Sequence, residues 1–444
     1  MNVVVEKELP KGWASATIKE LVSLINGRAF KPEDWSDTGM PIVRIQNLNN
    51  PDKSFNYCNF KVDKKFLIDN GQLLFAWSGT PGTSFGAFIW NRGKAILNQH
   101  IFRIEINEKL TNKKFLLYAI NQNINKYIVK AHGTAGLAHI TKGMFEEDLV
   151  LLPPLNEQKR IVAKIEELFS LVDSTKDTLE KTLVLLKQYR QSILKHAFEG
   201  KLVPQDPNDE PASVLLEKIK KENPDKKFSE IISEKVLPNG WIECSFQHII
   251  TNHDSKRIPV SAESRKNMKG KYPYYGASGI IDYVNKPIFN GKYLLIGEDG
   301  ANLLSRSTPI AFIAEGEFWV NNHAHILTCN GGILLEYVSY YINSKNLSQW
   351  ISGTAQPKLN QYNLNKIPIL LAPLNEQKEI VSKIEESFSL IEKNEILIDK
   401  LLLQYKQIKS SILKQAFEGK LVPQDPNDEP AEVLLQRIRE EKKK

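Results

Sequence analysis

Two segments of the chain repeat each other at a constant spacing of 219 residues. PLNEQKRIVAKIEELFSLVDS at 154–174 returns as PLNEQKEIVSKIEESFSLIEK at 373–393, and AFEGKLVPQDPNDEPA at 197–212 returns unchanged at 416–431. Because both pairs have the same spacing, no residue has been inserted or deleted between them. Such self-similarity indicates that the chain carries two copies of one structural unit, which we call the arms.

The segments that precede the arms share only a skeleton. LPKGW at 9–13 corresponds to LPNGW at 237–241, and LNQH at 97–100 corresponds to VNNH at 320–323. The spacing drifts between these landmarks, so the loops between them differ in length. We therefore predict four parts: domain 1 at 1–153, a first arm with its tail at 154–227, domain 2 at 228–372, and a second arm with its tail at 373–444.

Each arm has the hydrophobic pattern of a long helix that pairs with another. Apolar residues recur at alternating steps of three and four, a heptad pattern typical of coiled coils. In the first arm they are Val162, Ile165, Phe169, Val172, Leu179, Leu183, Leu186 and Ile193. In the second arm the equivalent residues are Val381, Ile384, Phe388, Ile391, Ile398, Leu402, Tyr405 and Ile412. Asn156 and Asn375 suit the N-cap, and Gly200 and Gly419 suit the C-terminal stop. A chain that runs out along one arm and back along the other makes the two helices antiparallel.

This order predicts an α+β fold with two mixed α/β domains, separated by two long antiparallel coiled-coil helices and related by a pseudo-two-fold repeat. Pairing within one chain is favoured because connected elements usually pack together; a dimer of whole chains is the alternative. Lys176 and Glu395 interrupt the stripes at equivalent positions. They are predicted either to form an ion pair that sets the register or to extend separately into solvent.

Both domains read as mixed α/β. The sequence predicts strands at 41–45, 71–76, 102–106 and 292–296, and helices at 114–127 and 334–342. Polar loops rich in Gly, Ser, Thr, Asn and Tyr connect them. Side chains of this kind can contact base edges or phosphates, although plain turns have the same composition.

Composition excludes several classes of protein. No segment approaches the ~18 apolar residues of a membrane span, and the first ten residues have no apolar core of a signal peptide. Three separated cysteines, Cys58, Cys244 and Cys329, cannot build a disulfide framework or a paired-cysteine zinc site, and they fit the reducing cytoplasm. The net charge of +7 arises in the domains, since domain 1 has 19 basic against 14 acidic residues and domain 2 has 13 against 11. A polyanion partner is permitted but not required.

Patterns for catalysis are mostly absent. The chain has no phosphate-binding GxxxxGK[ST] loop, no GxGxxG, no HExxH and no GxSxG. The Asn-Pro-Pro-Tyr and Asp-Pro-Pro-Tyr motifs that hold a flipped adenine are also missing. His323-x-His325 lacks a third metal ligand, and Asp52 with Asp63-x-Lys65 fits a nuclease pattern only loosely. We expect no catalytic residue and no metal site.

The repeated features together resemble the specificity subunit of type I restriction–modification systems. They are the PLNEQK entries to both helices, the LP-x-GW openings, the AF-x-GKL helix exits, and the Gly-Thr-Ala segments at 133–135 and 353–355. FAWSGT at 75–80 and YYGASG at 274–279 look like segments of the target-recognition domains of that family. The resemblance covers the whole chain.

The resemblance implies a non-catalytic, cytoplasmic subunit that binds double-stranded DNA. Each domain would read one half of a bipartite, gapped site, and the helices would set the gap. Two identical arms imply two copies of one partner, which in this family is the adenine methyltransferase subunit that uses S-adenosylmethionine. Motor-nuclease subunits that use ATP and Mg²⁺ would complete the complex. No cofactor and no membrane partner are expected for this chain itself.

Candidate DNA-binding residues follow from their chemistry and their predicted loops, since Arg, Asn and Gln suit purine edges and Lys suits phosphate. In domain 1 they are Arg28, Lys31, Arg44, Gln46, Ser78, Thr80, Arg92, His132, His139 and Lys142. In domain 2 they are Lys256, Arg257, Arg265, Lys266, Lys269, Lys271, Tyr274, Tyr275, Asn302, Arg306, Lys358, Asn360 and Gln361. Gln99, His100, Asn322 and His323 recur in both domains, which suggests a role in the fold.

Two other classes of function remain open on the residues alone. A coiled-coil adaptor whose domains bind proteins would show neither salt-sensitive nor sequence-dependent DNA binding. An enzyme acting on DNA would need turnover by the purified chain, for which the motifs give no support.

Overall fold

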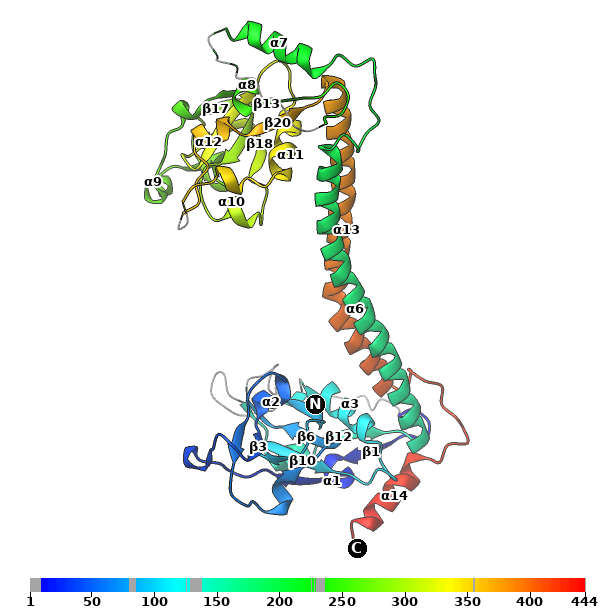
Figure 1. Ribbon diagram of the computed structural model, residues 1–444. Coiled ribbons are helices and arrows are strands. Elements are labelled where there is room, and N and C mark those ends of the chain that lie inside the picture. Colours follow the sequence, from blue (N-terminus) through cyan, green and yellow to red (C-terminus); the bar gives the residue numbers. More distant parts are fainter. Residues whose placement is uncertain are drawn as a thin grey trace. The chain divides into compact units, whose positions relative to one another are not determined.

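The computed structural model describes residues 9–79, 85–124, 126–127, 138–224, 226, 228, 236–353 and 356–443. The chain divides into two compact units, Met1–Leu179 with Lys400–Lys444, and Glu180–Asp399. We call them unit 1 and unit 2. Each unit holds one mixed α/β domain and part of each long helix (Figure 1). Unit 1 also contains the tail of the second arm, which ends the chain, and unit 2 contains the tail of the first arm.

Domain 1 in unit 1 is built on two four-stranded sheets. One has the order β2-β10-β6-β8 and the other the order β4-β3-β9-β5. Their strands are β2 (Ser23–Asn26), β10 (Ile101–Glu105), β6 (Gln72–Ala76), β8 (Gly86–Trp90), β4 (Asn56–Cys58), β3 (Met40–Val43), β9 (Ala95–Leu97) and β5 (Leu67–Ile68). Two short pairs join β1 (Ala14–Thr17) to β12 (Leu149–Leu152) and β7 (Ser78–Gly79) to β11 (Ala138–His139). The helices are α1 (Ile18–Leu21), α2 (Ile45–Asn49), α3 (Lys113–Gln122) and α5 (Lys142–Glu146), with short 3-10 turns η1 (Pro32–Asp34) and η2 (Lys64–Phe66).

Domain 2 in unit 2 has one six-stranded sheet of order β14-β19-β17-β18-β15-β16. Its strands are β14 (Ile250–Asn252), β19 (Ala324–Cys329), β17 (Phe289–Gly297), β18 (Ala311–Val320), β15 (Lys269–Gly276) and β16 (Gly279–Val284), and a further pair joins β13 (Ile242–Ser245) to β20 (Pro368–Leu371). The helices are α8 (Phe246–Ile249), α9 (Ala262–Lys266), α10 (Asn302–Ser305), α11 (Leu335–Ser344) and α12 (Gln361–Asn365), with 3-10 turns η3 (Asp254–Lys256) and η4 (Ser348–Trp350).

The predicted elements are found with shifted ends. The predicted strand at 41–45 stops at Val43, because α2 begins at Ile45 after Arg44, whose backbone N–H donates to the side chain of Asn47. The predicted helix at 114–127 is α3 as far as Gln122; it is interrupted at Asn123, which takes a non-helical cap conformation, and residues 124, 126 and 127 are helical again. The strand predicted at 292–296 lies inside the longer β17, and the helix predicted at 334–342 is α11.

The two long helices are α6 (Leu155–Ala197) and α13 (Leu374–Phe417). Residues of the predicted stripe are buried or half-buried, whereas their neighbours on the outer faces are exposed. Each helix begins at the leucine before the predicted cap, so Asn156 and Asn375 lie in the first turn and the N-cap prediction is wrong. Gly200 and Gly419 end the helices with φ near +67° and +70°, as predicted, because the left-handed conformation suits glycine.

The residues that interrupt the stripes meet across the helix pair, but not as predicted. In unit 2, Arg190 donates to Glu395 at 2.9 Å, and both side chains are about three-quarters buried. The residues equivalent to this pair are Lys409 and Lys176 in unit 1, which are both cations. Lys409 instead binds Asp173 at 2.6 Å, and the Lys176 ammonium lies 5.9 Å from the ring centre of Tyr405. The predicted Lys176–Glu395 ion pair is therefore wrong, because the antiparallel register gives each residue a different partner.

The tail of each arm packs against the domain in its own unit. α14 (Ala431–Glu441) binds domain 1 through Ala431 N–H and the Gly12 carbonyl at 2.8 Å. α7 (Ala212–Glu222) makes the same contact with domain 2, from Ala212 N–H to the Gly240 carbonyl at 2.9 Å. The end of the chain therefore closes back on its beginning within unit 1.

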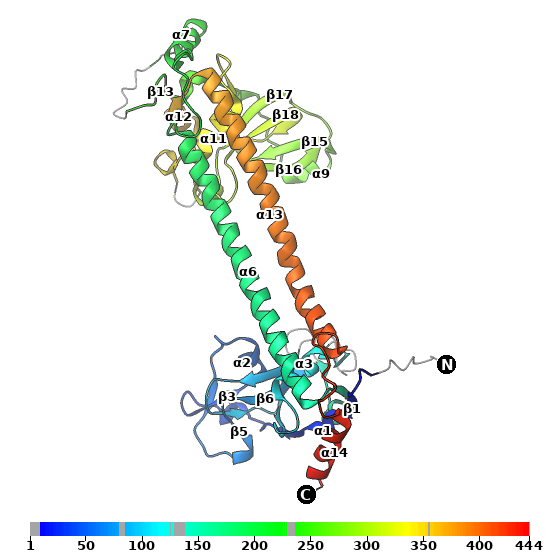
Figure 2. The same cartoon turned by 90° about the vertical axis from the view of Figure 1, so that its right-hand side faces the viewer.

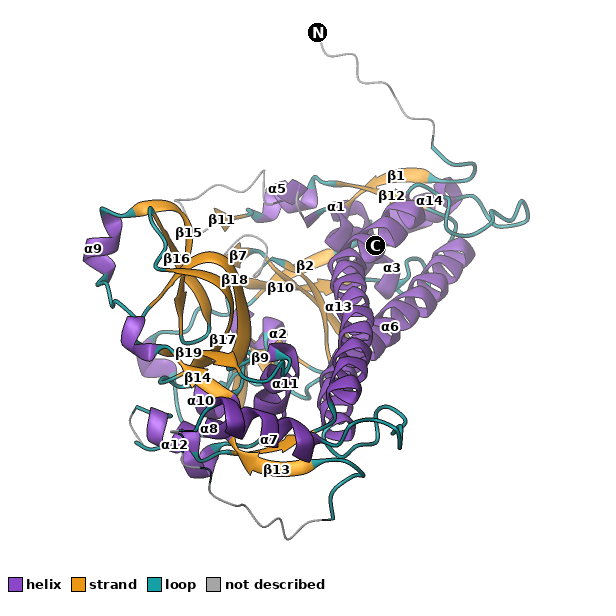
Figure 3. Cartoon of the chain, turned by 90° about the horizontal axis from the view of Figure 1, so that it is seen from above, coloured by secondary structure: helices purple, strands orange, loops and turns teal. Residues whose placement is uncertain are grey.

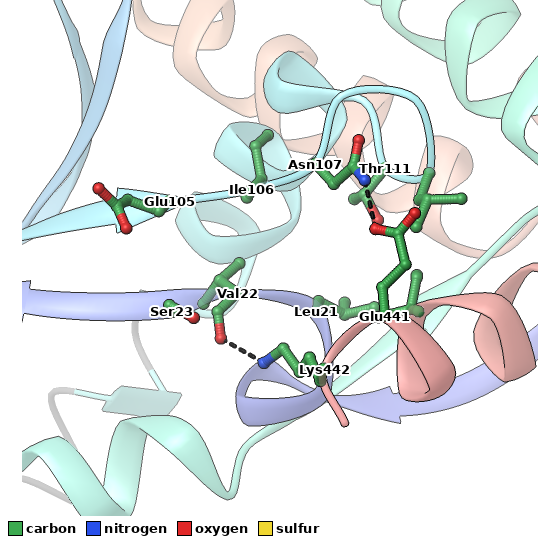
Figure 4. Close-up of a pocket in the computed structure, with 11 residues that line it drawn as sticks. Leu21, Val22, Ser23, Glu105, Ile106, Asn107, Thr111, Glu441 and Lys442 are labelled. Atoms are coloured by element: carbon green, nitrogen blue, oxygen red, sulfur yellow. Dashed lines mark hydrogen bonds between the residues drawn. The ribbon is translucent and has the colours of Figure 1, made fainter. Parts of the chain in front are cut away.

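A small pocket marks this closure in unit 1 (Figure 4). Lys442 donates to the carbonyl of Val22 at 2.6 Å, and Asn107 donates to the carboxylate of Glu441. In unit 2, Lys226 donates to the carbonyl of Ile250 at 2.7 Å. Val22 and Ile250 are the residues that end α1 and α8, so a lysine caps the same helix end in both units. Among the described residues no helix is long and apolar enough to cross a membrane.

Replacing Glu395 by alanine should destabilise unit 2, because Arg190 would be left without its partner in a mostly buried position. A partly shielded pair of this kind contributes about 1 kcal/mol, which corresponds to about 2 °C in the thermal midpoint of a unit of this size. Calorimetry of the full chain measures the shift. E386A is the matched control, since the Glu386–Lys383 pair on the same helix is exposed, and it should leave the midpoint unchanged. Equal midpoints for E395A and wild type would show that the pair adds nothing.

Candidate nucleic-acid interface

The same contact seats each domain on its long helix. The indole N–H of Trp13 donates to Glu157 at 3.0 Å in unit 1, and that of Trp241 donates to Glu376 at 2.8 Å in unit 2. All four residues are buried, and burial raises the pKa of both carboxyl groups. The tryptophans come from the LP-x-GW openings and the glutamates from the PLNEQK entries. The repeated motifs therefore meet in space and fix the base of each domain.

A second repeated contact positions a two-stranded ribbon in each domain. In domain 1, Asn98 N–H donates to the Val43 carbonyl at the end of β3; in domain 2, Asn321 N–H donates to the Tyr275 carbonyl of β15. The side chains of both asparagines accept from the N–H two residues later, at His100 and His323. The Asn-x-His segments, for which a role in the fold was expected, therefore shape a turn. This turn holds the ribbons β3–β4 and β15–β16 in the same place in the two domains.

Positive charge gathers around these ribbons. In domain 2, residues 256–286 contain seven basic and two acidic residues, whereas the rest of 228–372 contains six and nine. In domain 1, residues 44–94 contain seven basic and three acidic residues, whereas the rest of 1–153 contains twelve and eleven. Each domain thus has one basic segment: in domain 2 it includes the whole β15–β16 ribbon, and in domain 1 it begins directly after β3 and includes β4. A concentrated basic surface is the electrostatic signature of a DNA-binding face.

The basic segment of domain 2 presents several of the predicted residues. Lys256, Lys266, Lys269 and Lys271 are exposed. Lys269 binds Asp282 at 2.7 Å and is still about two-thirds exposed. The hydrogen bonds from Lys269, from the Tyr283 N–H and from Arg265 lower the pKa of Asp282 to about 2, so this carboxylate stays charged and fixes the ribbon's cations.

Some predicted residues in domain 2 support the fold and are buried or half-buried. Tyr274 is fully buried beneath the ribbon, so its predicted contact with DNA is corrected. Arg265 bonds Asp282 and the Val260 carbonyl, and its guanidinium covers the Tyr274 ring. Tyr275 packs against Phe312 and Phe318.

Arg257 belongs to a largely buried charge cluster, which also corrects its assignment. It donates to Glu298 at 2.8 Å and lies 3.4 Å from Asp254. His325 contacts Asp254 through Nδ1 at 2.5 Å and the Leu359 carbonyl through Nε2 at 2.8 Å. Burial alone would raise the pKa of Asp254, but its bonds from His325 and Ile326 and the charge of Arg257 hold that pKa below its usual range.

The cluster has the ligand types of a metal site but the geometry of an ion-pair network. Asp254, Glu298 and His325 could offer three ligand atoms close together. However, both nitrogens of His325 already have partners, and Arg257 supplies a cation to both Asp254 and Glu298. Through Leu359 and the Lys358–Glu298 pair at 3.2 Å, the network fixes the segment that carries Lys358, Asn360 and Gln361.

The other predicted residues divide in the same way between surface and support. Arg44 bonds Asn56 across the β3–β4 ribbon at 3.0 Å, and Arg92 bonds the Asn47 carbonyl while its guanidinium covers Phe55. Exposed positions are Lys31, Gln46, Arg92, Lys142, Lys358 and Gln361. Supporting positions are Arg28 over the Phe60 ring, Ser78 bonded to His139, Asn302 bonded to the Thr308 backbone, Arg306 bonded to the Lys345 carbonyl, and Asn360 as the N-cap of α12. Thr80 and His132 lie outside the described residues.

The sequence interpretation missed part of both basic segments. Lys53, Lys61, Lys64 and Lys65 lie between β3 and β6, and Lys286 follows β16. A running count of charge along each domain would have found them, because the excess is concentrated within a few dozen residues.

Comparison with known proteins identifies the two domains. The family model described as the type I restriction modification DNA specificity domain matches residues 10–183 and again 239–403. The chain is 26% identical to the EcoBI type I restriction enzyme specificity subunit of Escherichia coli, over 97% of this chain and 92% of that one. It is also 26% identical to the EcoDI specificity subunit of Escherichia coli, over 98% of this chain and 96% of that one.

Solved structures show the same fold. The crystal structure of the HsdS subunit from Thermoanaerobacter tengcongensis is similar with a TM-score of 0.61 and 17% identity, over 94% of this chain and 99% of that one. A chain from a study of complex assembly in a type I R-M system gives a TM-score of 0.63 at 17% identity, over 93% of this chain and all of that one. The family model alone covers most of the sequence in two copies. The chain therefore belongs to the family of type I restriction–modification specificity subunits and carries two DNA specificity domains.

Proposed function

We propose that this protein is the DNA-recognition subunit of a type I restriction–modification complex, and that each domain reads one half of a bipartite, gapped DNA site. The observation that carries the proposal is the contrast between repeated and diverged parts. The Trp–Glu contact and the Asn-x-His turn recur in both units. The ribbons that they hold have different sequences. Two recognition domains that differ in sequence but are attached to the helices by the same contacts suit a DNA site with two different halves.

The two long helices suit a spacer between the readers. Their apolar stripes match those of an antiparallel coiled coil, and the repeated contacts suit a pseudo-two-fold relation between the arms. A helix rises about 1.5 Å per residue, so helices of this length can span one or more turns of DNA, which are ~34 Å each. We infer that the helix length sets the gap between the half-sites.

The outer surface of the helices supports docking of two copies of one partner. In unit 1, Leu171 and Ile408 are 62% and 46% exposed; in unit 2 their equivalents Leu390 and Tyr189 are 63% and 56% exposed. Large apolar residues left in water at repeated positions indicate a protein-binding surface. Since both copies of the surface match, both bind the same protein, which we propose is the methyltransferase subunit.

Methylation and cleavage of the DNA would then be carried out by the partner subunits. We propose that this chain is not itself an enzyme and has no cofactor of its own. S-adenosylmethionine would bind the methyltransferase subunits, and ATP with Mg²⁺ would bind the motor-nuclease subunits. A subunit that works on chromosomal DNA of a bacterium or archaeon acts in the cytoplasm.

An adenine-methylation map of the host genome, with and without this gene, tests the assignment. We expect deletion to remove methylation from one gapped, asymmetric motif, because no other subunit would direct the methyltransferase there. Restoring the gene should restore the motif. An unchanged map in cells that express the complete system would contradict the proposal, and binding assays against protein partners would then test the adaptor alternative.

The basic ribbon of domain 2 gives a prediction about affinity. The triple variant K266A/K269A/K271A in the assembled complex should weaken DNA binding and lower the slope of log affinity against log salt by about 1 for each phosphate that is no longer neutralised. Titrations at several salt concentrations measure both effects. K218A/K220A/K221A removes as many charges from α7 in the same unit and should change neither. Equal slopes for the two triple variants would remove the ribbon from the interface.

A further inference from the structure

The β15–β16 ribbon forms one edge of the domain 2 sheet. β16 is the last strand in the order and pairs only with β15 among the described strands. β15 meets its other neighbour, β18, over just two residue pairs, Tyr274–Trp319 and Tyr275–Val320. Most of the ribbon is therefore two-stranded. It lies at the side of the domain away from the long helices (Figures 2 and 3).

The inner face of the ribbon covers a small core. Tyr274, Val284 and Trp319 are buried there, together with parts of Val260 and Met268. Alternation along β16 places Tyr283 and Ile281 on the outer face, away from the face that carries Val284 and Asp282. The outer face is therefore not needed to close this core.

A bulge adds a third apolar residue to this outer region. The register passes from Tyr274–Asp282 directly to Tyr275–Ile280, so Ile281 is an extra residue in β16. A bulge breaks the alternation of side chains, which lets two consecutive residues face the same way. Ile280, Ile281 and Tyr283 are 46%, 54% and 49% exposed. Three large apolar side chains thus lie in water at a sheet edge.

Their surroundings are cationic. The exposed Lys269 and Lys271 lie at the start of β15, and the exposed Lys266 ends α9 just before it. The segment 256–286 that contains the ribbon has seven basic and two acidic residues, a net charge of +5. Asp282 is held by Arg265 and Lys269 on the inner side. An apolar strip inside a basic segment matches a surface that is itself polyanionic with embedded apolar groups. The DNA major groove is such a surface, because phosphates line it and each thymine adds a methyl group.

We propose that the β15–β16 ribbon enters the major groove and that Ile280, Ile281 and Tyr283 read thymine methyl groups in the half-site of domain 2. This rests on the proposed DNA-recognition function and adds the base that domain 2 reads. The major groove is about 12 Å wide and admits a two-stranded ribbon. The lysines bind the flanking phosphates, and the apolar side chains exclude water from the thymine methyl groups. A cytosine at the same position offers no methyl group to bury.

The test uses the assembled complex and duplexes in which deoxyuridine replaces thymine, one half-site at a time. Deoxyuridine pairs as thymine does and lacks only the methyl group. We expect the substitution in one half-site to weaken binding about fourfold for each methyl group that is no longer buried. The variant I280S/Y283S should show a smaller difference between thymine and deoxyuridine duplexes than wild type, because its serines cannot cover the methyl groups and only Ile281 remains to do so. Ile281 is retained since it packs beside Gly276.

V236S is the control, because Val236 is fully exposed and lies outside the ribbon. It should keep the wild-type sensitivity to deoxyuridine. The inference is overturned if wild type binds both duplexes equally, if I280S/Y283S keeps the full sensitivity, or if no half-site contains an A·T pair. These results are distinct from failure of the proposed function, in which the complex would show no preference for any gapped site.

Discussion

The pairing of α6 with α13 is the interaction on which the rest of the protein depends. Each helix has a single apolar stripe, which it cannot bury alone. Because the chain passes through domain 2 between the helices, pairing them brings together segments that lie far apart in sequence. Each compact unit therefore takes one domain, part of both helices and the tail of the other arm. Arg190 with Glu395 and Lys409 with Asp173 fix the pairing inside their own units.

The first turns of the two long helices attach the domains to the helix pair. Trp13 and Trp241 reach carboxylates in the first turns of α6 and α13, at Glu157 and Glu376. These contacts are buried, so a substitution there would leave a buried polar group without its partner and lower the folding stability. The repeated motifs therefore have little freedom to change. The ribbons above them have no such constraint on their outer faces. This division explains how one chain can hold two arms that begin and end with the same sequence and two domains that differ in most residues.

Much of the architecture could be predicted from the sequence, because it is expressed as periodicity and repetition. The heptad stripe, the glycine stops and the mixed α/β domains were found in this way. The Lys176–Glu395 pair could not be predicted, since the register of two antiparallel helices is decided by packing along their whole length. The DNA-facing residues were harder still: Tyr274 and Arg257 have the right chemistry, yet the first covers a core and the second neutralises a buried carboxylate cluster. The burial of a side chain decides whether it can contact DNA or instead stabilises the fold, and burial is known only once the domain is folded. Where each domain contacts DNA remains a prediction.

The mass of the assembled methyltransferase complex tests most directly whether the paired arms give two equivalent docking surfaces. Native mass spectrometry of the wild-type complex should give two methyltransferase subunits for each copy of this chain. L390D and L171D each place a charge on one exposed apolar surface, and each should reduce the count to one. I396D is the matched control: Ile396 is as exposed as Leu390, but its repeat equivalent is already Asp177, so both copies should remain bound. A single methyltransferase subunit in the wild-type complex, or two in both L390D and L171D, would contradict the account.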